Sequence, residues 1–259
     1  EAAKVADAPG GLELDPALDV PRNVHAIDVH LMPGSYTRGA DSLEAGAVYD
    51  RGLAVFSMGL MGANLDDIGL SMSQYIKQRF PDFAPQRILD LGCTIGHNTL
   101  PWKQAYPAAE VIAIDAAPGP LAYGSARAKM QGQEVLFRQM CADDLAFEDG
   151  SFDVVWSSMF LHELSKKQRA KVFEEAFRVL KPGGLMLHME LPPNEQMGAF
   201  DGFYLDWDSY YNNEPYYKGY RDEVPRELCA RAGFGDADYF DFVVPSIGIY
   251  GEAAVADAA

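Results

Sequence analysis

The stretch RILDLGCTIGHNT, residues 87–99, decides the fold of this chain. Its apolar run ILDL at 88–91 is typical of a short strand buried inside a sheet. Gly92 and Gly96 follow, and glycine allows tight curvature and lets bare backbone amides approach a bound molecule. The stretch therefore predicts a strand, a ligand-binding turn and the start of a helix, as in nucleotide-binding α/β folds.

The turn differs from two common phosphate-binding loops. No Lys-Ser/Thr pair follows its last glycine and the GxGxxG spacing is absent, so we expect no triphosphate site. The turn instead resembles the acidic-x-Gly-x-Gly-x-Gly loop of class I S-adenosylmethionine-dependent methyltransferases, with Asp90, Gly92, Thr94 and Gly96 in the four defining positions. Thr94 replaces the middle glycine, so its backbone must do without a positive φ or accept strain.

Further segments follow in the order that this family requires. The strand-like EVIAID at 110–115 ends in an acid about 20 residues beyond the loop, the spacing at which dinucleotide folds bind ribose hydroxyls. Additional strands are predicted at 134–138, within 141–158 and at 184–190, and a closing pair at 236–244 and 247–250. The resemblance implies an α/β fold: a seven-stranded, mostly parallel sheet with helices on both faces, an antiparallel closing hairpin and an N-terminal helical cap.

The chain divides into segments of different composition. We expect a flexible arm at 1–22, a helical cap at 23–84, a core at 85–251 with an inserted aromatic lid at 192–220, and a tail at 252–259. Apolar residues recur at helical spacing in several segments. Helices are predicted within 47–80 and at 99–106, 118–131, 166–180 and 225–232.

The resemblance implies that the cofactor is S-adenosylmethionine. Amides of residues 92–96 would serve its carboxylate, Asp90 its ammonium and Asp115 its two ribose hydroxyls. For the adenine, Ala142 would offer its backbone amide. Cys141 stands where the family usually has an acid, so Asp143 would bind the adenine amino group instead. Asp143 could equally be a surface acid. The full predicted cofactor set is Asp90, Gly92, Cys93, Thr94, Gly96, Thr99, Asp115, Ala116, Ala142, Asp143, Ser157 and Tyr49.

His162 is the candidate general base. It lies just past the predicted fourth strand, at the edge where open α/β sheets bind ligands. A base is needed for a hydroxyl or carbon acid, and much less for a carboxylate or neutral amine. The alternative is that His162 only orders the turn into the next helix. Glu163 is adjacent, but neighbouring residues on a helix diverge.

The lid is rich in aromatic residues, which can form the walls of an apolar or aromatic substrate pocket. The alternatives are a homodimer contact or a small separate core. Acids among the rings also permit a cationic or metal-bridged acceptor, although we assign no metal. For His25, Asp28 and His30 we expect ordinary loop contacts. The predicted substrate set is Tyr36, Phe203, Trp207, Tyr211 and Tyr216.

Composition restricts the partners. The formal net charge of −17 over 259 residues disfavours nucleic acid and anionic membranes. The densest basic run, at 166–171, is predicted to be a solvated helix face. Three scattered cysteines indicate a reducing compartment, and no apolar stretch approaches the roughly 20 residues that span a bilayer. We expect a cytoplasmic protein with a small-molecule acceptor. Because residue 1 is Glu and not Met, we also expect that further residues originally preceded it.

These observations predict a methyltransferase that acts on a small, apolar or aromatic metabolite by direct displacement. Two other classes stay open. The chain could be a non-catalytic regulatory module that binds S-adenosylmethionine, or it could methylate a protein side chain.

Overall fold

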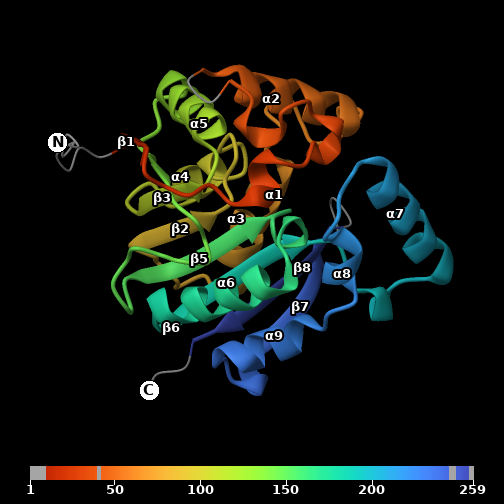
Figure 1. Cartoon of the computed structure of the whole chain (residues 1–259). Helices are drawn as coiled ribbons and strands as arrows, with labels where there is room; N and C mark the ends of the chain where they lie inside the picture. The colour runs from red at the N-terminus through yellow and green to blue at the C-terminus, as the bar shows by residue number, and fades with distance from the viewer. Residues whose placement is uncertain (1–9, 40–41, 245–248, 257–259) are drawn as a thin grey trace.

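The computed structural model describes residues 10–39, 42–244 and 249–256. Within them a single sheet has the strand order β1-β4-β3-β2-β5-β6-β8-β7 (Figure 1). Strands β1 to β6 are mutually parallel, and β8 and β7 close the sheet with antiparallel pairing. The strands are β1 (Gly11–Glu13), β2 (Arg87–Leu91), β3 (Glu110–Asp115), β4 (Leu136–Gln139), β5 (Phe152–Ser158), β6 (Leu180–Glu190), β7 (Tyr239–Val244) and β8 (Ile249–Val255).

The predicted fold class is confirmed, with one more strand than expected. The extra strand is β1, three residues of the predicted arm that pair with β4 at the sheet edge, Gly11 opposite Leu136. The turn at 245–248, on which the predicted hairpin depends, lies outside the described residues. Strand β8 continues to Val255, beyond the expected end of the core at residue 251.

Helices cover both faces of the sheet, as predicted. Side chains of α3, α4 and α5 share one hydrophobic core with the sheet, and those of α6 and α9 share the other. The helices are α1 (Arg22–His25), α2 (Glu44–Phe56), α3 (Asp67–Arg79), α4 (Leu100–Ala105), α5 (Pro118–Met130), α6 (Lys166–Val179), α7 (Ala199–Tyr211), α8 (Tyr217–Arg221) and α9 (Pro225–Ala232). Short 3-10 turns are η1 (Val29–Leu31), η2 (Ser35–Thr37), η3 (Leu161–Glu163), η4 (Asn194–Gln196) and η5 (Asp236–Asp238).

The predicted helical stretch 47–80 is two helices with a turn between them. Gly59 and Gly62 in that turn have φ of 76° and 77°, a left-handed conformation that interrupts a right-handed helix. Helix α3 buries Met72 and Ile76 against the sheet, as its spacing predicted.

The basic run on α6 is only partly solvated, contrary to expectation. Arg169 is 1% exposed, because its guanidinium pairs with Glu223 at 2.6 Å and also donates to the Leu164 carbonyl. Ser165 begins the helix with a capping box that includes Gln168.

The N-terminal cap is connected to the core by hydrogen bonds. Asp50 of α2 accepts hydrogen bonds from Arg127 at 2.7 Å and from the Tyr123 hydroxyl at 3.0 Å, both on α5. The Gly69 amide of α3 donates to Asn98 Oδ1 at 3.0 Å. These contacts hold the cap over the ends of the central strands.

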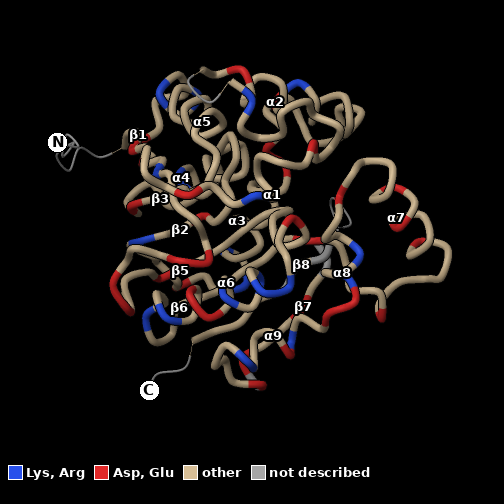
Figure 2. The backbone as a smooth tube through the Cα atoms, in the orientation of Figure 1, with Lys and Arg blue, Asp and Glu red and all other residues tan. Residues whose placement is uncertain are grey.

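Helix α7 stands away from the rest of the molecule, at the right of Figure 1. Acidic and basic positions are interspersed over most of the chain, but α7 carries acidic ones alone (Figure 2). Its aromatic side chains are exposed: Phe200, Phe203, Tyr204, Trp207, Tyr210 and Tyr211. Among the described residues, no helix has the length and apolar character needed to cross a bilayer.

Candidate functional site

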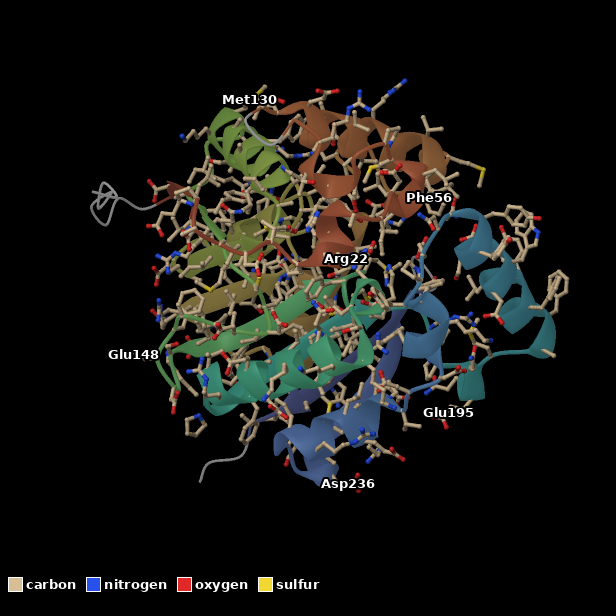
Figure 3. The ribbon with its side chains drawn as sticks, viewed as in Figure 1. Arg22, Phe56, Met130, Glu148, Glu195 and Asp236 are labelled. Atoms are coloured by element: carbon tan, nitrogen blue, oxygen red, sulfur yellow. The ribbon has the colours of Figure 1, made fainter. Side chains whose placement is uncertain are left out.

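A cavity of about 350 Å³ lies at the carboxyl ends of the parallel strands. The strand order reverses between β2 and β5, where an open sheet leaves a crevice for ligands. The register places Leu91 of β2 opposite Ile114 of β3 and Ser157 of β5, so the segments that follow these strands meet at one edge. The N-terminal cap forms the opposite wall, with Phe56, labelled in Figure 3, at the end of α2.

The loop after β2 forms the floor of the cavity. A Cβ on Gly92 would lie 2.2 Å from the Phe160 ring, so only glycine fits there. Thr94 has a φ of 49°, which is unusual for a β-branched residue. Of the two alternatives predicted for Thr94, the structure therefore shows the strained backbone with positive φ. Its amide donates to Asp115 Oδ2 at 2.9 Å, which holds the loop in this conformation.

Two carboxyl groups line the cavity without a cationic partner. Asp90 accepts a hydrogen bond from the Thr99 hydroxyl, and burial raises the pKa of Asp90 to about 8. Asp115 accepts bonds from the amides of Thr94 and Ala117, and burial raises its pKa to about 6. No described lysine or arginine pairs with either acid, so the site suits a ligand that brings positive charge and hydroxyl donors.

A smaller cavity of about 60 Å³ continues from the first, and both include Gly92 and Asp115. It is lined by Ala116, Ala142 and Asp143 of the predicted cofactor set and by Cys141. Strand β4 ends just before this segment, which explains how the predicted adenine turn comes to lie beside Asp115.

Aromatic rings from the cap and the core form one wall of the main cavity. The centroid of the Tyr49 ring is 5.8 Å from that of Tyr36 and 6.0 Å from that of His97. Burial and the nearby Glu163 charge raise the pKa of both tyrosines, so the phenols stay neutral. Burial lowers the pKa of His97 to about 3, which leaves that imidazole neutral too.

His162 is buried at the cavity wall beside two glutamates. Its Nδ1 lies 2.7 Å from Glu190 Oε2, and its Nε2 lies 4.0 Å from Glu214 Oε2. Burial alone would lower the pKa of His162, but the charge and hydrogen bond of Glu190 raise it above the usual range. A carboxylate at Nδ1 leaves Nε2 as the atom that can exchange a proton with a ligand.

His30 also lines the cavity, so the expectation of ordinary loop contacts is wrong for this residue. Its Nε2 lies 3.0 Å from Glu163 Oε1, which also accepts the Tyr36 hydroxyl at 2.9 Å. Its Nδ1 lies 3.3 Å from Glu214 Oε1. Burial alone would lower the pKa of His30, but the two glutamates raise it to about 10.

We call Tyr36, His30, Glu163, Glu214, His162 and Glu190 the acid-histidine network. Its members come from the cap, the turn after β5, the end of β6 and the lid segment. Glu163 and His162 both reach the cavity because η3 is a short turn and not the α-helix assumed for them. No spacing in the sequence connects these distant residues, so Glu190 and Glu214 could not be found from it.

Several predicted site residues do not line either cavity. The Gly96 amide donates to the Cys93 carbonyl at 2.8 Å, the Thr99 hydroxyl donates to Asp90, and the Ser157 hydroxyl lies 2.7 Å from His188 Nδ1. The neighbouring Ser158 lines the cavity instead and accepts a bond from Asn98 at 3.1 Å. The lid residues that the structure does not bring to the cavity are Phe203, Trp207, Tyr211 and Tyr216.

The lid reaches the site through other residues. Tyr217 contacts the His162 ring edge-on at 4.8 Å between centroids, and Glu214 joins the network. Asp206, one of the lid acids considered for a cationic acceptor, pairs with Lys218 at 2.5 Å and with Arg221.

Comparison with known proteins gives a consistent family. Residues 88–184 match a family described as a methyltransferase domain. The chain is 39% identical over 117 residues to a demethylmenaquinone methyltransferase of Thermus thermophilus, covering 45% of this chain and 52% of that protein. It is 30% identical over 190 residues to a malonyl-[acyl-carrier protein] O-methyltransferase of Gallionella capsiferriformans, covering 70% and 58%. The chain spans about half the length of the curated relatives it matches.

Solved structures of similar fold extend the comparison. The YcgJ protein of Bacillus subtilis superposes with a TM-score of 0.52 at 26% identity, covering 66% of this chain and 70% of that one. Human N-acetylserotonin methyltransferase, solved with S-adenosylmethionine, gives a TM-score of 0.60 at 15% identity, covering 84% and 57%. At this low identity the second likeness concerns the fold alone.

Proposed function

This chain contains a methyltransferase domain of the class I, Rossmann-like fold, and we propose that it transfers a methyl group from S-adenosylmethionine to a small-molecule acceptor. One observation carries the proposal. Asp90, the loop at 92–94, Asp115 and His162 all line one cavity.

The residues present suit each part of the cofactor. The unpaired Asp90 would hold the ammonium and Asp115 the ribose hydroxyls, and the loop amides would serve the carboxylate. Ala142 and Asp143 in the smaller cavity would receive the adenine. When bound, S-adenosylmethionine supplies an electrophilic methyl group on a sulfonium sulfur.

The acceptor would lie between this floor and the cap. The cavity walls there include Leu53, Phe56 and Met61 from the cap and Met159 from the core. These apolar side chains favour an apolar or aromatic acceptor. His162 Nε2 would take the proton of the attacking group, with Glu190 keeping the imidazole in place. The half-buried tyrosines Tyr36 and Tyr49 would exclude water from the reacting groups. Methyl displacement is faster in a water-poor site that aligns donor and acceptor.

Two measurements on the purified protein test the proposal. Calorimetry should show saturable binding of S-adenosylmethionine and of its demethylated product. Incubation with methyl-labelled S-adenosylmethionine and a metabolite extract should then place label in the solvent-extractable fraction. Absence of binding would overturn the proposal altogether. Binding without any transfer would indicate a regulatory module, and label found in macromolecules would indicate a protein substrate.

A further inference from the structure

We infer that the acceptor is uncharged: an apolar molecule with a hydroxyl group and without carboxylate, phosphate or ammonium. The inference rests on the proposed function and names the substrate class of that same site. It follows from how charge is distributed around the acceptor end of the cavity.

The cavity offers no cation to an anionic acceptor. Among the described residues, no lysine or arginine lines either cavity. Three guanidinium groups of adjoining helices are already paired: Arg127 with Asp50 at 2.7 Å, Arg169 with Glu223 at 2.6 Å, and Arg221 with Asp206. Arg22, next to the lining residue Asn23, is exposed. A carboxylate or phosphate would therefore lose its hydration without gaining a charged partner, which is costly in a buried site.

The two imidazoles do not supply that missing charge. His30 lies between Glu163 at 3.0 Å and Glu214 at 3.3 Å, and His162 lies 2.7 Å from Glu190. Three glutamates thus face two histidines, so the acid-histidine network keeps a net negative charge even with both rings protonated. A second anion beside it would be repelled.

The carboxylates of the network already have partners, so an ammonium group would have to displace a histidine to pair with one. Glu163 and Glu214 share His30, and Glu190 is occupied by His162 and by the amides of Phe160 and Leu161 at 2.7 and 2.6 Å. The remaining lining at this end is apolar or neutral, with Met32, Leu53, Phe56, Met61 and Leu191. His162 Nε2 lies 4.0 Å from Glu214 Oε2, beyond hydrogen-bond distance, so this atom can accept the proton of a hydroxyl.

A matched set of ligands tests this inference by binding alone. 2-Naphthol, 2-naphthoate and 2-naphthylmethylamine share one ring system and differ in charge at pH 7. Titrated against protein saturated with S-adenosylhomocysteine, 2-naphthol should bind at least tenfold more tightly than either charged analogue. Tighter or equal binding of 2-naphthoate, or of the amine, would overturn the inference.

Two variants make the test specific for charge. Ser57→Lys adds a cation at the cavity wall. The dissociation constant of 2-naphthoate divided by that of 2-naphthol should then fall at least threefold. Gln131→Lys adds the same charge at an exposed position beyond α5 and should leave the ratio as in the wild type. If Ser57→Lys does not fold, Glu163→Gln serves instead, because loss of one carboxylate should also strengthen binding of 2-naphthoate. An unchanged ratio in a folded cavity variant would contradict the inference.

Failure of the inference can be distinguished from failure of the proposed function. Each sample is first titrated with S-adenosylhomocysteine. A protein that does not bind it fails the proposed function, whereas one that binds it but prefers a charged naphthalene fails only the inference.

Discussion

Glu190 fixes the orientation of His162. Its Oε2 lies 2.7 Å from His162 Nδ1, while its Oε1 accepts the amides of Phe160 and Leu161. Glu190 is the last residue of β6 and is fully buried, so the carboxylate is held by the sheet itself. The turn after β5 and the imidazole that it carries are therefore positioned by the adjacent strand.

The substitution Glu190→Gln should slow turnover about a hundredfold, because the imidazole loses the carboxylate that sets its tautomer. Binding of S-adenosylhomocysteine should change little. The pH profile gives an independent readout. The glutamate raises the pKa of His162, so without it burial dominates and the acid limb of the activity profile should move to lower pH. Glu227→Gln, at an exposed position, is a matched control. If the acid limb of the activity profile stays at the same pH in Glu190→Gln, Glu190 does not position His162.

The substitution Asp115→Asn should weaken binding of S-adenosylmethionine by about 2 kcal/mol, or roughly 30-fold, because charge-assisted hydrogen bonds to hydroxyls are lost. The side chain keeps its size, but its NH2 group replaces one of the two oxygens that accept from the Thr94 and Ala117 amides, so one of these bonds is lost as well. Asp144→Asn is the control, since this exposed acid lines neither cavity. Calorimetry measures both dissociation constants, and equal values would rule out Asp115 as a cofactor ligand.

Asp90 should release a proton when S-adenosylmethionine binds. Burial raises its pKa to about 8, so the free protein holds this carboxyl group mostly protonated at pH 7. An ammonium group beside it favours the ionised form and lowers that pKa. Calorimetry at pH 7 in buffers of different ionisation enthalpy should therefore report on the order of one proton released, falling toward zero above pH 9. Asp90→Asn should remove the effect, and buffer-independent heats in the wild type would contradict the assignment.

His30 should make a contribution to stability that depends on pH. Its folded pKa of about 10 lies above the value near 6.5 of an unfolded histidine. A raised pKa means that the stabilisation is fully present below pH 6.5 and is lost as the pH rises through 10. Urea unfolding of wild type and His30→Gln should thus differ most at pH 6 and converge near pH 10. A difference that grows with pH would show that the ring is neutral in the fold.

Much of the core could be predicted from residues that are close together in the sequence. The run ILDL at 88–91, the glycine turn and the acid at 115 predicted adjacent buried strands and the cavity floor, because strand burial and turn geometry depend on residues close in sequence. The helix on 225–232 was predicted with the observed bounds for the same reason. The extra strand β1 was missed, because three residues at a sheet edge carry almost no periodic signal.

The sequence by itself determined the central strands, the helices that flank them and the loop that would hold the cofactor, since each is encoded in contiguous residues. Only the tertiary structure decided the acid-histidine network, which joins His30, Glu163 and Glu214 across more than a hundred residues of chain. It also decided that the lid presents its α7 aromatics to the surface, lines the cavity with Asn212 and contacts the His162 ring through Tyr217. Contacts between distant segments depend on how whole elements pack, and no local spacing records that packing.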